Sequence, residues 1–148
     1  MISLQSGEFL ELNIKDLMIS SERVAHVQIG NSLEHALLVL TRSGYTAVPV
    51  LNAHFHLLGL ISTPIIMDAI LGLERIEFEQ LEQKRVEEVM NRSIPRVRID
   101  SELKSSLDLL VDHPFLCVED AGGIFEGILT RRSVLQHLNK HVRKLNRK

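Results

Sequence analysis

Gly59-Leu60-Ile61-Ser62 recurs as Gly127-Ile128-Leu129-Thr130, 68 residues further along the chain. Two other pairs of segments repeat in the same order, one ending in methionine and one rich in β-branched residues: Asp16-Leu17-Met18 with Glu88-Val89-Met90, and Val27-Gln28-Ile29 with Val97-Arg98-Ile99. Matching segments in a fixed order indicate an internal repeat. The spacing falls from 72 to 70 to 68 along the chain. The second copy is therefore expected to lack a few loop residues, since loops tolerate deletions.

Each copy predicts the same order of elements, β-α-β-β-α. Strands are expected at residues 24–29, 46–51 and 56–62, and again at 94–99, 115–119 and 124–130. Asn31-Ser32 and Asp100-Ser101 are expected to cap the helix after the first strand. Gly44 suits the end of the first such helix, and Pro64 suits the first turn of the final helix of that copy. The fold class is therefore α/β (α+β).

The repeat divides the chain into residues 15–72 and 86–141, separated by a charged linker helix at 73–85 and followed by a basic tail at 142–148. A unit of about 55 to 60 residues buries too little apolar surface to be comfortable alone. We therefore expect the two copies to pack with pseudo-two-fold symmetry around a common core. A cleft between them would suit a small ligand.

Composition narrows the functional classes. The chain has 148 residues, a formal net charge of −2 and one cysteine, Cys117, which excludes an intramolecular disulfide and a multi-cysteine metal site. We expect a cytoplasmic protein without a signal peptide or membrane span. The sequence has no phosphate-binding loop, serine elbow or zinc-protease helix, so we predict no enzyme activity. Two histidine pairs, His54 with His56 and His137 with His141, are expected to be surface residues rather than metal ligands.

The most chemically suggestive segment is Thr130-Arg131-Arg132-Ser133, at the expected start of the last helix. A helix N-terminus attracts anions, and two arginines there are unfavourable for the helix itself, so a bound phosphate would explain them. The alternative is that both arginines are solvated or pair with Glu119 or Asp120. The matching segment of the first copy, Thr63-Pro64-Ile65, has no cation and lacks one N–H group. Any phosphate is therefore expected to bind the second copy.

The stretch from Lys140 to Lys148, which includes the basic tail, carries no acidic residue: Lys140, Arg143, Lys144, Arg147 and Lys148 are its cations. Cations at a helix end complement the helix dipole, which accounts for them without a ligand. The alternative is contact with an acidic partner, a nucleic acid or a membrane surface. The tail has no aromatic residue for stacking on bases, which weakens the nucleic-acid alternative.

Together these motifs resemble tandem CBS domains, the Bateman module, over about residues 15–141. The chain is particularly similar to the small stand-alone CBS proteins of Firmicutes that bind cyclic di-AMP. The resemblance implies that residues of the first strand and of the turn into the second contact adenine: Val24, Ala25, His26, Val27, Tyr45, Thr46 and Ala47. The matching positions of the second copy are Pro95, Arg96 and Val97, and Pro114, Phe115 and Leu116. Tyr45 could cover a base or could be a residue at the edge of the core.

In this family the Gly-x-x-Ser/Thr-x-x-Asp ending usually holds a ribose through its last residue. Here Ser62 and Thr130 match, but the aspartate positions hold Ile65 and Ser133. The absence of aspartate at these two positions argues against simple AMP-like binding. The expected ligand-binding residues of this region are therefore Thr130, Arg131, Arg132 and Ser133.

The resemblance predicts a non-enzymatic adenine-nucleotide sensor, a homodimer that binds cyclic di-AMP and regulates partner proteins according to occupancy, without a further cofactor or metal. In similar proteins the nucleotide-free form engages targets such as the (p)ppGpp synthetase/hydrolase and pyruvate carboxylase. The alternative is an AMP- or ATP-responsive subunit of a metabolic enzyme or transporter assembly. A third hypothesis, nucleic-acid association through the basic tail, is the weakest, and no membrane partner is expected.

Overall fold

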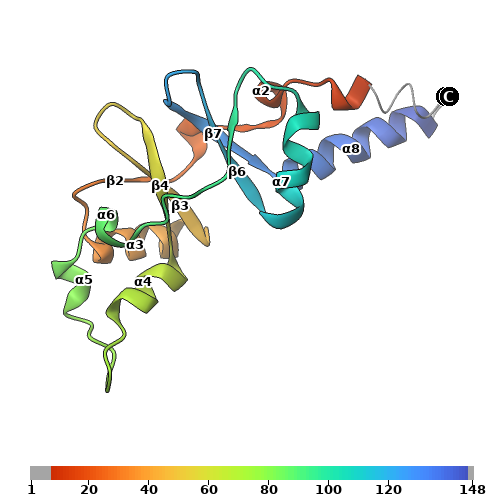
Figure 1. Cartoon of the computed structure of the whole chain (residues 1–148). Coiled ribbons are helices and arrows are strands. Elements are labelled where there is room, and N and C mark those ends of the chain that lie inside the picture. Colours follow the sequence, from red (N-terminus) through yellow and green to blue (C-terminus); the bar gives the residue numbers. More distant parts are fainter. Residues whose placement is uncertain (1–7, 147–148) are drawn as a thin grey trace. The chain divides into compact units, whose positions relative to one another are not determined.

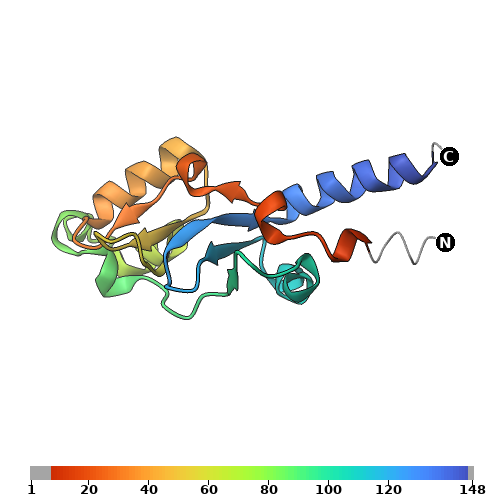
Figure 2. The same cartoon turned by 90° about the horizontal axis from the view of Figure 1, so that it is seen from above.

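The chain forms two compact units, and each has its own sheet (Figures 1 and 2). The computed structural model describes residues 8–146. One unit is the continuous segment Ala25–Ile94, and the other combines the N-terminal segment up to Val24 with the chain from Pro95 onward. Arg147 and Lys148 of the basic tail, and the first residues of the N-terminus, lie outside the described residues.

The continuous unit contains the first repeat from Ala25 onward. Its elements are β2 (Val27–Gln28), α3 (Leu33–Ser43), β3 (Ala47–Leu51), β4 (Leu57–Ser62), α4 (Thr63–Ile70), α5 (Gln80–Gln83) and α6 (Val86–Val89). The sheet has the order β2-β3-β4, with β2 parallel to β3 and β3 antiparallel to β4. Ser32 Oγ accepts from the His35 N–H at 3.1 Å, and Gly44 ends α3 with φ of 77°, so both predicted caps of this helix are confirmed.

The discontinuous unit contains the second repeat. Its elements are α2 (Ile14–Leu17), β1 (Ile19–Ser20), η1 (Ser21–Arg23), β5 (Arg96–Arg98), η2 (Leu103–Ser106), α7 (Leu107–Asp112), β6 (Phe115–Glu119), β7 (Phe125–Thr130) and α8 (Arg131–Asn146). The sheet order is β1-β7-β6-β5. Both repeats therefore have the predicted β-α-β-β-α order, and the α/β class is confirmed.

Each unit has a core made mainly of the aliphatic residues that the repeat pattern places on strands and helices. In the continuous unit Leu33, Val48, Val50, Ile61 and Ile66 are fully buried. In the discontinuous unit Ile14, Leu103, Leu116, Val118 and Leu129 are fully buried. Both cores are thus built from matching positions of the two copies.

The segments at the start of the two repeats are exchanged between the units. We call residues 12–20 and 84–91 the first and second leader. The first leader pairs with the second repeat through Asn13↔Glu102 and through Ile19↔Ile128 in the β1–β7 ladder. The second leader pairs with the first repeat at the equivalent positions, Arg85↔Ser32 and Asn91↔Leu60. Each repeat therefore completes its unit with the leader of the other.

The leader exchange explains the glycine that opens the repeated Gly-aliphatic-aliphatic-Ser/Thr motif. A Cβ at Gly127 would lie 2.1 Å from the Ile19 carbonyl oxygen, and Gly127 has φ of 156°. A Cβ at Gly59 would lie 2.7 Å from the Asn91 carbonyl oxygen. Glycine inside a strand commonly marks the close approach of another backbone. At both positions the approaching backbone is a leader.

Two local predictions were wrong. The expected linker helix at 73–85 is reduced to the four residues of α5. The residues before α5 form a hairpin instead, because Leu71 pairs with Ile76 and the Glu77 N–H donates to the Ile70 carbonyl. Asp100-Ser101 does not cap a helix. Ser101 Oγ instead donates to the Arg98 carbonyl at 2.5 Å. The helical segment begins as η2 at Leu103, whose N–H donates to the carbonyl of Leu12 in the first leader.

Candidate functional site

The start of α8 lies where the strand β7 ends, in the discontinuous unit. Thr130 Oγ1 accepts from the Ser133 N–H at 3.0 Å, and the Arg131 N–H donates to the Pro114 carbonyl at 3.0 Å. Ser133 Oγ donates to the Leu17 carbonyl of the first leader. Thr130 thus caps the first turn of α8, and Ser133 ties that turn to the first leader. Together they hold in place the helix N-terminus, which favours anions.

The two adjacent arginines have different roles, although sequence reasoning treated them alike. Arg131 Nε donates to the Leu110 carbonyl at 2.6 Å and Nη2 donates to the Val111 carbonyl at 2.8 Å. These carbonyls belong to the last turn of α7, where a cation complements the helix dipole. Arg131 therefore binds the C-terminal end of α7. Its guanidinium is occupied there, so we do not assign it to the predicted anion site. Neither Glu119 nor Asp120 pairs with it; Glu119 forms its ion pair with Arg96 at 3.2 Å.

Arg132 lines a pocket of about 310 Å³ beside the start of α8, which we call the helix-start pocket. Its other wall comes from the first leader and the residues after it. The full lining is Asp16, Leu17, Met18, Ile19, Arg23, Thr130, Arg132, Ser133, Gln136 and His137. Three of the four residues predicted around the helix start, Thr130, Arg132 and Ser133, thus lie together.

Arg23 is the residue of this pocket that sequence reasoning missed. It ends η1, directly after β1, and its side chain is exposed. The β1–β7 pairing brings it to the start of α8, so no signal within its own repeat could have placed it there. Two guanidinium groups and a helix N-terminus suit a phosphate, whereas the carboxylate of Asp16 can accept from a hydroxyl or amino group.

The other predicted residues lie in the continuous unit, except Val24, which is buried and ends the first segment of the discontinuous unit. Val27 is buried in β2 and pairs with Val50. Because β2 and β3 are parallel, Ala25 and His26 lie at the end of the sheet where β3 begins, the end that also holds Tyr45, Thr46 and Ala47. The structure therefore brings the two predicted adenine-contacting stretches of the first repeat to one sheet end.

Three residues, His26, Tyr45 and Thr46, have surroundings that bear on a ligand. The ring of His26 packs edge-on against Phe55, with 5.3 Å between ring centroids. Tyr45 is 37% exposed, so its ring is not part of the core. The Thr46 carbonyl accepts from the Thr63 N–H at 3.4 Å. A flat ligand could therefore contact exposed Tyr45 without disrupting the core.

The buried thiol of Cys117 is not a reactive group. Cys117 lies in β6, and burial raises the pKa of its thiol to about 12. The histidine pair at the β3–β4 turn helps to form the turn, with His56 Nδ1 and Asn52 Nδ2 3.3 Å apart. Within residues 8–146 no group of three His, Cys, Asp or Glu side chains is placed to hold a metal ion. No helix in this part of the chain is long and apolar enough to cross a bilayer.

Two repeats with a β-α-β-β-α order, each closed by Gly-aliphatic-aliphatic-Ser/Thr before a helix, define a class of proteins built from tandem α/β repeats. The CBS domain family matches residues 14–72 and 86–140, and the chain belongs to this family.

Among its relatives is cyclic di-AMP receptor B of Bacillus subtilis, which is 54% identical over 147 residues, 99% of this chain and 100% of the relative. A crystal structure of a CBS domain-containing protein of unknown function from Bacillus anthracis is 58% identical, with a TM-score of 0.84 over 91% of this chain and 98% of that chain. The CbpB protein of Listeria monocytogenes, crystallised with c-di-AMP, is 55% identical, with a TM-score of 0.81 over 88% of this chain and 97% of that chain.

Proposed function

We propose that the protein is a cyclic di-AMP receptor whose occupancy controls how it engages partner proteins. The observation that carries the proposal is the full-length similarity, at 54% identity, to a protein named as a cyclic di-AMP receptor. A protein 55% identical to this chain has been crystallised with c-di-AMP. The helix-start pocket adds an independent chemical argument, because it presents two arginines beside a helix N-terminus.

Within the discontinuous unit, we assign a ligand phosphate to Arg132 and Arg23. Thr130 and Ser133 hold the helix start and are positioning residues. Arg132 can offer a forked pair of N–H groups to phosphate oxygens, and each such charge-assisted bond contributes about 1.5–3 kcal/mol when partly shielded from water. Asp16, on the leader wall, can accept a hydrogen bond from a ligand hydroxyl.

Within the continuous unit, we assign adenine contacts to the sheet end that holds Ala25, His26 and Tyr45-Thr46-Ala47. Ala25 and His26 precede the β2–β3 ladder, so their backbone groups are outside the sheet pairing and suit the edge of a base. The small side chain of Ala25 permits close approach, and Tyr45 offers an exposed ring. Val24 belongs to the discontinuous unit, and we propose a separate ligand contact for its backbone there.

Cyclic di-AMP is a better candidate than AMP or ATP because the residues that usually hold a free ribose are absent. Ile65 has no polar group, and Ser133 Oγ already donates to the Leu17 carbonyl. A cyclic dinucleotide has its 3′ and 5′ oxygens esterified and relies more on phosphate and base contacts. The arrangement of Arg23 and Arg132 suits that demand.

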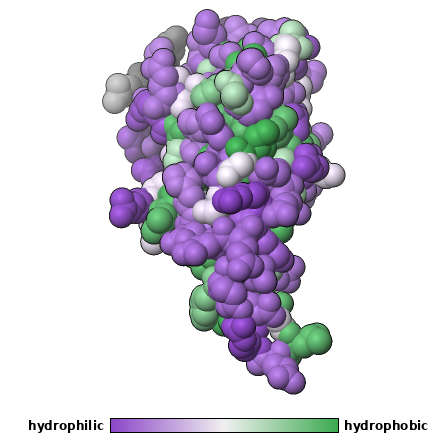
Figure 3. Space-filling model, turned by 90° about the vertical axis from the view of Figure 1, so that its left-hand side faces the viewer, coloured by the Kyte–Doolittle hydropathy of each residue, from purple (hydrophilic) through white to green (hydrophobic). Residues whose placement is uncertain are grey.

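We further propose a cytoplasmic, non-enzymatic homodimer. Exposed apolar side chains support an association surface: between α4 and α5, Leu73 is fully exposed, and Leu71 and Phe78 are 58% and 61% exposed. The face in Figure 3 is mostly hydrophilic; hydrophobic residues are visible in its upper half and also at its lower end, where Figure 1 places this segment. The targets that we propose are those implied by the family resemblance, the (p)ppGpp synthetase/hydrolase and pyruvate carboxylase.

Isothermal titration calorimetry tests the ligand assignment. We expect saturable binding of cyclic di-AMP and much weaker binding of AMP and ATP, with none for duplex DNA. Arg132→Met should weaken cyclic di-AMP by about 10- to 100-fold, from the loss of one charge-assisted contact. Arg143→Met, on the same helix but outside the helix-start pocket, is the control and should bind normally. Saturable AMP binding without cyclic di-AMP binding would refute the assignment. Pull-downs of the two targets with and without cyclic di-AMP then test the regulatory step.

A further inference from the structure

The face of α8 that packs on the discontinuous unit changes character after its first turns. Val134 on this face is buried at 7% exposure. His137, His141 and Lys144 follow it at helical spacing, so the stripe that begins as core continues as basic and aromatic residues. Figure 2 shows this part of α8 running beyond the sheet.

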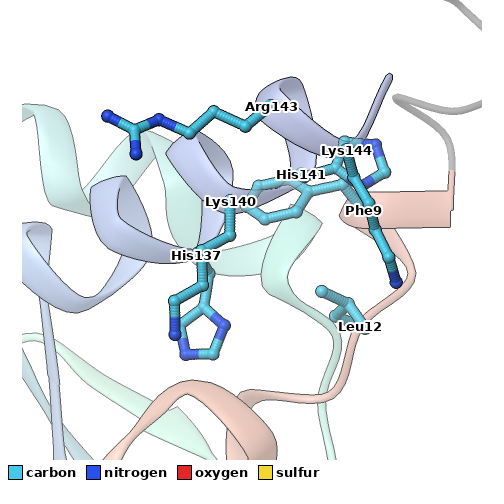
Figure 4. Close-up of a pocket in the computed structure, with 7 residues that line it drawn as sticks. All are labelled: Phe9, Leu12, His137, Lys140, His141, Arg143 and Lys144. Atoms are coloured by element: carbon cyan, nitrogen blue, oxygen red, sulfur yellow. The ribbon is translucent and has the colours of Figure 1, made fainter. Parts of the chain in front are cut away.

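The N-terminal segment lies opposite this stripe. Phe9 is 6% exposed, and its ring centroid is 5.6 Å from that of His141, at an interplanar angle of 36°. Leu12 is 36% exposed. Between them and α8 lies a groove of about 500 Å³, which we call the α8 groove (Figure 4); it is lined by Phe9, Leu12, His137, Lys140, His141, Arg143 and Lys144.

The α8 groove has cations and no carboxylate in its lining. Lys140, Arg143 and Lys144 form no ion pair with any residue that the structure describes. Glu8 and Glu11 adjoin Phe9 and Leu12 in sequence but do not line the groove. The helix dipole accounts for Arg143 and Lys144 in the last turn of α8, but Lys140 lies a turn earlier. In Figure 4 the Arg143 side chain extends away from Leu12, so the inner charge comes from Lys140 and Lys144.

We propose that the α8 groove binds an acidic, extended segment of a protein target. His137 and Lys144 are seven positions apart, about 10 Å along the helix, which matches three to four residues of extended chain. Lys140 and Lys144 are four positions apart, about 6 Å along the helix, so they can pair with two carboxylates two positions apart on an extended segment. Exposed Leu12 can contact one apolar side chain of the segment. Charge complementarity of this kind steers a partner to its surface and sets its register.

The groove fits other anionic ligands less well. Phe9 is nearly fully buried and stacked on His141, so it has no free face for a nucleotide base. Among the residues that line the groove, Leu12 is the exposed apolar one. The lining therefore has no apolar face broad enough to enter a membrane. The overall charge of −2 opposes a nucleic acid, whose binding depends on a wide basic surface.

The inference rests on the proposed function in one respect only, that a regulator has a protein target. The α8 groove and the helix-start pocket share His137 alone. Lys140 and Lys144 can therefore be changed without touching the residues assigned to the nucleotide.

Fluorescence anisotropy with the full chain tests the proposal. The probe is a short labelled peptide that alternates pairs of Asp or Glu with Leu, and the control peptide carries Asn and Gln in place of the acids. We expect saturable binding of the acidic peptide alone, weakened by salt as screening predicts. The double variant Lys140→Glu, Lys144→Glu should bind it at least about tenfold more weakly. The control variant Lys104→Glu changes the charge of an exposed lysine of the same unit, outside the groove, and should bind like the unaltered chain.

The proposal is overturned if the acidic peptide does not saturate, if the Asn/Gln peptide binds equally, or if the double variant behaves like Lys104→Glu. It is also overturned if the double variant loses binding of duplex DNA or anionic vesicles while acidic-peptide binding is unchanged. Cyclic di-AMP titrations of the same double variant should match the unaltered chain. Failure of cyclic di-AMP binding in every protein, with acidic-peptide binding intact, would refute the proposed function and leave the α8 groove assignment standing.

Discussion

Replacing Gly127 by alanine tests the leader exchange most directly. The new Cβ would lie 2.1 Å from the Ile19 carbonyl oxygen and 3.1 Å from its carbon, far inside the ordinary contact distance of about 3.5 Å. Both atoms are backbone, so β1 must move away from β7. The two residue pairs of that ladder are then lost, which costs about 2 kcal/mol at about 1 kcal/mol per hydrogen bond. A φ of 156° adds about 1–3 kcal/mol for a residue with a side chain.

We therefore expect Gly127→Ala to lower the free energy of unfolding by about 3–5 kcal/mol. Urea denaturation followed by circular dichroism measures the change. Gly122→Ala is the matched control, because its Cβ would meet only Asp120 Oδ1 at 3.5 Å, an ordinary contact. Gly59→Ala should be intermediate, since one of its close neighbours is the flexible Met90 side chain. If Gly127→Ala proves as stable as Gly122→Ala, the close passage of the leader is not what requires glycine there. Should Gly127→Ala fail to fold, the ranking of Gly59→Ala against Gly122→Ala decides the same question.

Other predictions concern single side chains. Arg131→Met should lower the melting temperature, because it removes two hydrogen bonds to the end of α7. Arg132→Met should leave the melting temperature unchanged or slightly raised. Thermal scans compare the two variants, and equal melting temperatures would contradict the separate roles of the two arginines. Ser133→Ala should lower the free energy of unfolding by about 1 kcal/mol, because the Leu17 carbonyl loses its donor. Urea denaturation measures the change, and an unchanged free energy would show that this hydrogen bond does not hold the first leader. Cys117 should resist thiol reagents at pH 8 until the chain is denatured, because burial raises the pKa of its thiol to about 12; prompt labelling of the native protein would contradict this. Since that pKa exceeds the ordinary value of 9.0, the protonated thiol should contribute stability that is lost as pH rises from about 9 towards 12, and Cys117→Ala should remove this part of the pH dependence.

The sequence was enough to predict the order of the elements, because each copy repeats the same local signals. Ser32 and Gly44 act at their predicted caps, since capping depends on residues within one turn of the helix. The expected cap at Asp100-Ser101 failed because the first leader supplies the bonds there, with Leu103 N–H donating to the Leu12 carbonyl. A partner so distant in sequence leaves no local pattern.

The site shows the same limit. Arg132 could be predicted from its place at a helix start, but its neighbour Arg131 could not be told apart from it. What separates them is the end of α7, whose carbonyls accept from Arg131 across about 20 residues of chain. Arg23 could not be predicted at all, because the β1–β7 pairing alone brings it beside Arg132. Charge and spacing identify which residues suit a ligand, but strand pairing decides which of them meet.

The exchange of leaders also sets an order of events during synthesis. All residues of the continuous unit, Ala25 to Ile94, are available to one another once Ile94 has left the ribosome. The first leader, although made earlier, has no strand to join until β7 is complete, about 110 residues later. Ile14 and Leu17, which end up fully buried, are therefore synthesised long before β7 and are among the last residues to be shielded from water. A chaperone that binds the nascent chain would have its longest opportunity at this leader.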